Sequence, residues 1–186
     1  MARRQAPLLD RERLVAAGFA QLEEDGLEGL SMRRLAARLG VQAPALYWHI
    51  GDKAELMGLM ARAIYAVAYA TVPEASDWRG WLYGFGRALR TSFAAHRDGA
   101  RLCATAKEPS QPSRAEHARQ ISAPLLALGL DQPRALSFQA SVISFTLGWA
   151  SFEANGPMHD YLDELLDFDA SFETGLLALV RGFPAD

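Results

Sequence analysis

The chain has 186 residues, half of them apolar and 22% charged, with a net charge of −3 and a single cysteine. This apolar share is enough for a core, which argues against a disordered chain. One cysteine excludes an internal disulfide, and the sequence has neither a run of eighteen apolar residues nor a hydrophobic N-terminal segment, so we expect a cytoplasmic protein with no membrane partner.

Apolar spacing and capping signals predict helices throughout and no strand, so the expected fold class is all-α. The expected helices cover residues 10–25, two short helices within 31–49, then 52–71, 78–93, 114–128, 133–154 and 161–183, with a loop at 107–113.

Charge is divided unevenly along the chain. Residues 1–71 hold nine Lys and Arg against eight Asp and Glu, a balance of +1, whereas residues 72–186 hold ten against fourteen, a balance of −4. Only the first part can therefore favour a polyanion such as DNA. Its acids cluster at positions 23–28, and we expect the basic residues of 33–38 to lie apart from them on a basic face.

The segment 31–49 has the pattern of a helix-turn-helix. Gly40 supplies the turn, because glycine takes a positive φ without a Cβ clash. Two apolar pairs can pack the two helices together: Leu35 with Leu39, and Val41 with Leu46. Pro44 falls in the first turn of the second helix, where its missing N–H costs little. An ordinary surface hairpin has a similar composition, but the exposed aromatic residues that follow favour DNA binding.

Cations bind phosphate oxygens whatever the sequence, while side chains of a short helix in the major groove meet base edges. Small alanines can contact a thymine methyl but make no bidentate hydrogen bond, so Arg33 is the best candidate for a base contact. The candidate DNA-binding residues are Arg33, Gln42, Ala43, Pro44, Ala45, Tyr47, Trp48, His49 and Lys53.

The run Leu46-Tyr-Trp-His-Ile50, followed by Asp52-Lys53, resembles the end of the reading helix in the tetracycline repressor family. The segments His96-Arg97-Asp98-Gly99-Ala100 and Phe145-Thr146-Leu147-Gly148 resemble parts of that family's regulatory domain. The resemblance implies a DNA-binding domain at 1–51, a linking helix at 52–71, and an effector-binding and dimerisation domain at 72–186. It implies a transcriptional repressor with operator DNA and a small-molecule effector as partners, no cofactor and no enzymatic activity. The alternative that the protein is a co-activator and not a repressor stays open.

The helix expected at 133–154 is apolar on most of its circumference, and the one at 161–183 repeats the signal. Such a helix needs a core on one side and a second apolar surface on the other. Either both helices fill a monomer's core or, as the resemblance implies, they form a four-helix bundle in a homodimer that binds a palindromic operator. The candidate dimer-interface residues are Phe138, Val142, Phe145, Trp149, Phe168, Phe172, Leu176 and Leu179.

In the ligand site implied by the resemblance, several polar residues differ from those of a tetracycline-binding member of the family. Cys103 stands where a tetracycline-binding member has a magnesium-binding histidine, and a thiol is a poor magnesium ligand, so we expect no metal site. Tyr69 and Phe85 replace a histidine and an asparagine, while Gln120 and Glu153 match. We therefore expect a largely apolar or aromatic effector, although each aromatic residue alone could be core. The candidate ligand-binding residues are Tyr69, Trp81, Phe85, Leu89, Cys103, Gln120, Phe145, Trp149 and Glu153.

The competing function class is an all-helical enzyme, or a small-molecule-binding protein without sequence-specific DNA binding. Its candidate residues are His96, His117, and His159 with Asp160. No nucleophile elbow, phosphate loop or metal-binding histidine pair accompanies them, so we predict no catalytic residue.

Overall fold

The computed structural model describes residues 10–107, 114–154 and 156–185, and within these ranges the chain is helical with no strand, as predicted. None of the described helices is both long and apolar enough to cross a membrane. The loop predicted at 107–113 lies outside the described residues from position 108 onward. The helices are α1 (Arg11–Gly29), α2 (Met32–Leu39), α3 (Ala43–Leu46), α4 (Lys53–Ala70), α5 (Trp78–Ala94), α6 (Gly99–Thr105), α7 (Arg114–Ala127), α8 (Gln132–Glu153), α9 (Gly156–Asp163) and α10 (Phe168–Gly182).

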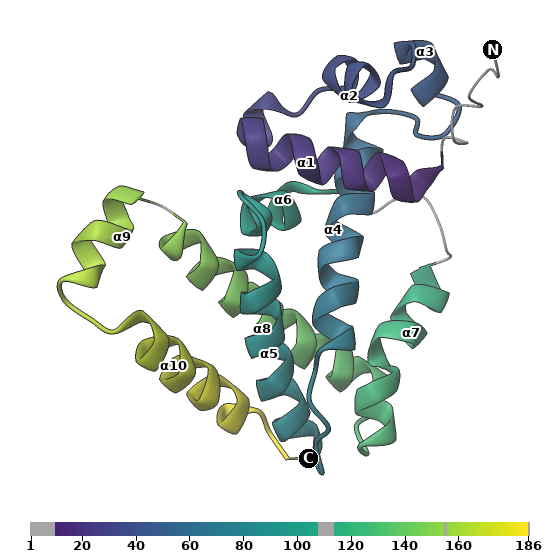
Figure 1. Cartoon of the computed structure of the whole chain (residues 1–186). Coiled ribbons are helices and arrows are strands. Elements are labelled where there is room, and N and C mark those ends of the chain that lie inside the picture. Colours follow the sequence, from purple (N-terminus) through teal and green to yellow (C-terminus); the bar gives the residue numbers. More distant parts are fainter. Residues whose placement is uncertain (1–9, 108–113, 155, 186) are drawn as a thin grey trace.

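The first three helices pack into one unit at the top of Figure 1. Leu14 of α1, Leu35 of α2 and Leu46 of α3 are fully buried, and Ile50 closes the same core. Burial of these side chains supplies the stability that α2 and α3 lack on their own, since isolated helices under a dozen residues are marginal in water.

Helix α4 connects this unit to the rest of the chain. Asp52 caps it by accepting a hydrogen bond from the Glu55 N–H at 2.7 Å, and the Glu55 carboxylate accepts one from the Gly51 N–H at 2.7 Å. A Cβ on Gly18 would lie 2.8 Å from the Met60 sulfur, so α1 and α4 approach closely at this glycine and a larger residue would displace the Met60 side chain. The start of α4 is thereby fixed to the first unit.

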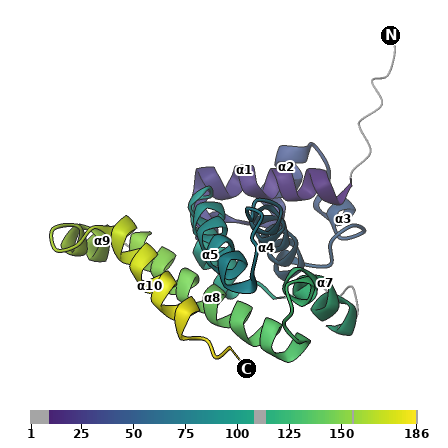
Figure 2. The ribbon, with the colours of Figure 1, turned by 90° about the horizontal axis from the view of Figure 1, so that it is seen from below.

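The larger part of the molecule is built around α5, which packs against α4, α8 and α10. Its buried face carries Leu82, Phe85, Leu89 and Phe93, one residue from each successive turn. Figures 1 and 2 show α4, α5 and α7 grouped together, while α9 and the adjoining end of α10 reach away to one side.

The prediction of one helix over 161–183 was wrong. The chain forms α9, leaves the helix, and starts α10 after Asp167, whose carboxylate accepts a hydrogen bond from the Ala170 N–H at 2.8 Å. Leu165, assigned to the apolar face of that helix, lies between the two helices and is 64% exposed. Helix α6 was not predicted, and α1 continues past 25 through a kink at Gly26.

Candidate functional site

Helices α2 and α3 form the predicted helix-turn-helix. Ser31 caps α2 by accepting from the Arg34 N–H at 3.3 Å, and α2 ends at Gly40, whose φ of 69° is left-handed. The Val41 N–H then donates to the Ala36 carbonyl at 3.0 Å, which closes the turn. Helix α3 has only four residues, and a turn continues it, with the His49 and Ile50 N–H groups both donating to the Leu46 carbonyl at 2.9 Å.

The outer side of this motif is exposed. Trp48 is 90% and Tyr47 52% exposed, which is unusual for side chains that gain so much by burial. Arg33, Gln42 and Pro44 are also exposed. The four other predicted DNA-binding residues are half-buried at the same end of the molecule: Ala43, Ala45, His49 and Lys53. The structure thus brings all nine to one end, and none of them belongs to the core.

The expectation that the motif's cations lie apart from the acids of 23–28 was wrong for two of them. Arg34 pairs with Asp25 at 2.6 Å, and Arg38 pairs with Glu24. The kink of α1 directs its acidic end toward α2, so these guanidinium groups are partly neutralised. Among the described residues Arg33 makes no ion pair, so its charge is available to a phosphate or a base.

A cavity of about 680 Å³ lies in the larger part of the molecule. Helix α4 supplies one wall from Gly58 to Ala70, α7 supplies another from His117 to Pro124, and single residues come from α5, α6 and α8. A volume of this size suits a small organic ligand.

Four of the nine predicted ligand-binding residues line this cavity: Tyr69, Trp81, Cys103 and Gln120. Phe85 and Leu89 are fully buried and do not line it. The Phe85 ring packs against the rings of Tyr69 and Trp81 at centroid distances of 4.7 and 5.0 Å, so Phe85 supports the wall from behind.

The three remaining predicted residues lie on the other side of α8 or at its end. Phe145 and Trp149 pack on Phe172 of α10, at centroid distances of 5.6 and 6.1 Å, and Glu153 forms an ion pair with Arg90. Two residues rotate a helix by about 200°, so Ile143, which does line the cavity, points away from Phe145. The α8 residues named from the sequence therefore do not line this cavity, and their role in ligand binding stays a prediction.

The cavity also uses residues that the sequence analysis missed. Tyr65 lies one turn before Tyr69 on the same face of α4, a spacing that could have indicated it, whereas Lys107 and His117 come from segments joined only by the tertiary fold.

The polar groups of the cavity wall are neutral or basic. Burial raises the pKa values of the Tyr65 and Tyr69 hydroxyls above their ordinary range and raises the pKa of the Cys103 thiol to about 12. The Tyr69 hydroxyl donates to Gln139 Oε1 at 2.6 Å, and Gln139 Nε2 donates to the Ile121 carbonyl at 3.0 Å, which fixes the tyrosine ring between α4, α7 and α8. A neutral thiol reacts slowly with oxidants.

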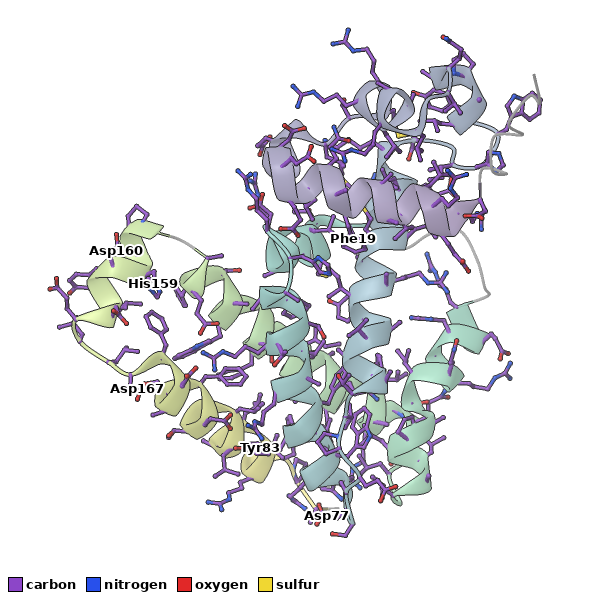
Figure 3. The ribbon with its side chains drawn as sticks, viewed as in Figure 1. Phe19, Asp77, Tyr83, His159, Asp160 and Asp167 are labelled. Atoms are coloured by element: carbon purple, nitrogen blue, oxygen red, sulfur yellow. The ribbon has the colours of Figure 1, made fainter. Side chains whose placement is uncertain are left out.

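A second contact joins the two parts of the molecule where the chain leaves α5. The His96 ring stacks on Phe19 with centroids 4.3 Å apart, and its Nδ1 lies 3.3 Å from Glu23 Oε1. The Asp98 carboxylate accepts a hydrogen bond from the Leu27 N–H at 2.8 Å, just after the kink of α1. Figure 3 shows Phe19 on the side of α1 that faces α6. We call this contact the junction.

Half of the predicted dimer-interface residues have no surface left for a partner. Phe138 is 6% exposed, and Val142, Phe172 and Leu176 are fully buried by their own chain, so their assignment was wrong. The physical reason is that this face of α8 packs on α5 and α10 within one chain. The other four, which are half-buried, are Phe145, Trp149, Phe168 and Leu179.

The outer face of α8 carries small residues at helical spacing, Ala140, Ser144, Gly148 and Ser151, and all four are exposed. A Cβ added to Gly148 would meet no atom within 4 Å. Exposed small residues allow a second helix to approach closely.

The histidines considered for catalysis are dispersed. His96 lies in the junction, His117 lines the cavity, and His159 stacks on Phe168 at 4.9 Å. Figure 3 shows His159 and Asp160 on α9, away from α4. Within the described ranges, no group of three or more His, Cys, Asp or Glu side chains could hold a metal ion.

Both parts of the chain match families of known proteins. Residues 14–60 match the family described as bacterial regulatory proteins, tetR family, and residues 72–161 match the tetracyclin repressor-like C-terminal domain. The tetracycline repressor protein class A from transposon 1721 of Escherichia coli is 34% identical over 91% of this chain and 88% of its own length. An HTH-type transcriptional regulator of Saccharopolyspora erythraea is 30% identical over 98% of this chain and 78% of its own.

Solved structures agree with these sequence matches. A TetR variant from Acinetobacter baumannii AYE in complex with minocycline has a TM-score of 0.77 and 34% identity, covering 95% of this chain and 97% of its own. The TetR family protein ActR of Streptomyces coelicolor, in complex with (S)-DNPA, has a TM-score of 0.75 and 27% identity, covering 94% and 97%.

Proposed function

Because the chain belongs to the tetR family of bacterial regulatory proteins, we propose that it is a ligand-responsive transcriptional repressor that binds a palindromic operator as a homodimer. A small, largely apolar or aromatic effector releases it from the operator. Residues 1–51 bind DNA, residues 52–71 link the domains, and residues 72–186 bind the effector and the second subunit. Regulators of this family are transcription factors and not enzymes.

The observation that carries this proposal is the course of α4. The helix starts at a cap directly after the helix-turn-helix, packs on α1 through Met60, and lines the cavity from Gly58 to Ala70. A ligand that moves the cavity wall therefore moves the element that holds the reading helix. Such a shared rigid element is the physical requirement for coupling two distant sites.

On the DNA side, the exposed face of α3 enters the major groove. Gln42, Ala43 and Ala45 meet base edges and thymine methyls, and Arg33 reaches a base from α2. Around them, Pro44, Tyr47, Trp48, His49 and Lys53 contact the backbone and fix the register. Trp48 supports this role because its 90% exposure leaves a large aromatic surface with nothing to cover it within its own chain.

The homodimer forms through α8 and α10. The exposed small residues of α8 lie beside the half-buried Phe145 and Trp149, so a second copy can cover both on close approach. A two-fold axis then presents two reading helices to half-sites about 34 Å apart, one turn of B-DNA. One helix as short as α3 reads too few bases to select a site from a genome, and two together can do so.

The effector lies among Tyr69, Trp81, Cys103 and Gln120 and is bound without a metal. Cys103 supports this because its thiol is buried and stays protonated at neutral pH, and a hard cation such as magnesium requires oxygen ligands. Phe85 and Leu89 hold the wall from behind.

Selection of bound sequences from random duplex DNA, with full-length protein at a stated salt concentration, tests the proposal. We expect a palindrome with two half-sites, and a Trp48→Ala variant that recovers it poorly. Enrichment of no sequence would contradict the proposal and would favour a small-molecule-binding protein without sequence-specific DNA binding.

A further inference from the structure

Two ion pairs join the end of α1 to α2 and neutralise part of the positive charge of the helix-turn-helix. Arg34 Nη1 lies 2.6 Å from Asp25 Oδ2, and Arg38 pairs with Glu24. The four side chains line one hollow of the surface, together with Gln21. Their exposed fractions run from 33% for Asp25 to 59% for Glu24, so water reaches both pairs.

The backbone around these pairs holds the carboxylates toward α2. Gly26, with a φ of 69°, bends the end of α1, and a Cβ on Gly29 would lie 2.4 Å from the Asp25 Cβ. Residue 29 therefore has to be small for the Asp25 side chain to lie where it does. Gln21 is 2% exposed; its amide nitrogen donates to the Gly29 carbonyl at 3.2 Å, and its Oε1 accepts from the Ser31 N–H at 3.4 Å. Since these bonds fix the start of α2 against α1, the fold itself brings the acids to the arginines.

Helix α2 lies where a helix-turn-helix approaches the DNA backbone. In this motif the first helix crosses the backbone while the second enters the major groove. Figure 1 shows α2 and α3 beyond α1, on the far side from α5 and α8. Arg34 and Arg38 are one turn apart on α2, so they can reach phosphates of one strand. Carboxylate and phosphate oxygens accept the same guanidinium hydrogen bonds, so one pairing replaces the other.

From this arrangement we propose that the acidic end of α1 is an autoinhibitory contact, in which Glu24 and Asp25 compete with DNA phosphates for the two arginines of α2. The inference rests on the proposed function, because it concerns the same DNA-binding surface. Exposed ion pairs are weak, so phosphates can displace the carboxylates when DNA binds. Arg33, the candidate for a base contact, makes no ion pair among the described residues and is not restrained in this way. The contact therefore lowers the affinity for DNA of any sequence and leaves the base contact in place.

Glu28 offers a matched control within the same acidic run. It lies one turn after Asp25 but pairs with Arg101 of α6, across the junction, and not with α2. Glu28→Gln removes the same unit of negative charge as Asp25→Asn without releasing an arginine of the helix-turn-helix.

The test measures the anisotropy of a labelled duplex of mixed sequence without a palindrome, titrated with full-length protein between about 50 and 200 mM salt. We expect Asp25→Asn and Glu24→Gln each to bind this duplex about threefold more tightly than the parent, the size expected for one exposed ion pair, and the double variant about tenfold. Each single variant should also steepen the fall of log K with log[salt] by about 0.9, because one more cation displaces counterions from the duplex. Glu28→Gln should leave this slope unchanged and the affinity close to that of the parent.

A second variant separates release of an arginine from simple loss of repulsion. Adding Arg34→Gln to Asp25→Asn should remove both the gain in affinity and the added salt dependence, because the released cation is then absent. Circular dichroism establishes that each variant is folded.

Three results would overturn the autoinhibitory contact while salt-dependent binding by the parent kept the proposed function standing. These are parental affinity and slope in both acid variants, an equal gain in Glu28→Gln, and a gain that persists after Arg34→Gln is added. Failure of the parent and of every variant to bind the duplex at low salt would overturn this inference and would also remove the support for a DNA-binding function.

Discussion

Asp98 holds the junction together from a backbone conformation that few residues adopt. Its φ of 55° and ψ of 18° are left-handed, and its carboxylate accepts the Leu27 N–H at 2.8 Å from across the two parts of the molecule. Replacing Asp98 therefore changes two terms in the free energy of unfolding: the hydrogen bond, and the cost of the left-handed conformation. Three substitutions separate these terms.

Asp98→Ala loses both terms. A hydrogen bond to a charged group contributes about 2 kcal/mol, and alanine in the left-handed region costs about 1 kcal/mol more, so we expect a loss of about 3 kcal/mol. Asp98→Gly loses the bond but adopts the conformation freely, for a net loss of about 2 kcal/mol. Asp98→Asn keeps a neutral acceptor and tolerates the conformation, and its loss should be about 1 kcal/mol.

Urea unfolding of the full-length protein, with every variant at the same protein concentration, measures these differences in the free energy of unfolding. Arg101→Gln is the control, because Arg101 pairs with Glu28 across the same junction and both side chains are more than half exposed; its loss should stay below about 0.5 kcal/mol. If Asp98→Ala were as stable as the parent, or if Asp98→Gly were destabilised as much as Asp98→Ala, the reasoning about the junction would be refuted.

Three further predictions concern the DNA surface, the dimer and the cavity. Arg33→Ala should relax base preference, whereas Lys53→Ala should weaken binding to all sequences evenly; anisotropy with a panel of operator variants distinguishes them, and the reverse pattern would exchange the two roles. Gly148→Arg should leave the protomer folded, since its Cβ meets open space, but should give a monomer in sedimentation analysis; an unchanged dimer would move the interface elsewhere. The Cys103 thiol, with a pKa raised by burial from 9.0 to about 12, should resist iodoacetamide at pH 8 until urea unfolds the chain. The stability contributed by the protonated Cys103 thiol should be present below pH 9 and lost toward pH 12, because the unfolded chain releases the thiol proton at a lower pH than the folded chain. Cys103→Ala should remove this part of the alkaline destabilisation.

The DNA-binding end was predictable because its signals are local. Ser31 and Asp52 are N-caps, each accepting a hydrogen bond from the backbone N–H three residues on. Gly40 caps the C-terminus of α2 in the left-handed conformation. Each of these signals acts within one turn of the chain. The same kind of signal at Asp167 was overlooked, because apolar spacing continued across it and predicted one long helix where two form.

The cavity was only partly predictable, because its walls depend on which face of each helix meets a neighbour. Helix α8 is apolar on two sides, so spacing alone could not decide between Phe145, which packs on α10, and Ile143, which lines the cavity. Similarly, no sequence pattern indicated that Arg34 and Arg38 would meet the acids of α1, since their pairing depends on the kink at Gly26.

The central claim is that a ligand in the cavity lowers operator affinity through α4. Anisotropy titration of the selected operator tests it most directly, with a panel of aromatic compounds added to the parent protein and to Ile143→Trp, a variant whose larger ring would fill part of the cavity. We predict that at least one compound releases the parent protein, that the variant binds operator normally without any compound, and that the same compound no longer releases the variant. Release of both proteins at the same concentration, or of neither, would contradict the claim that the cavity controls DNA binding.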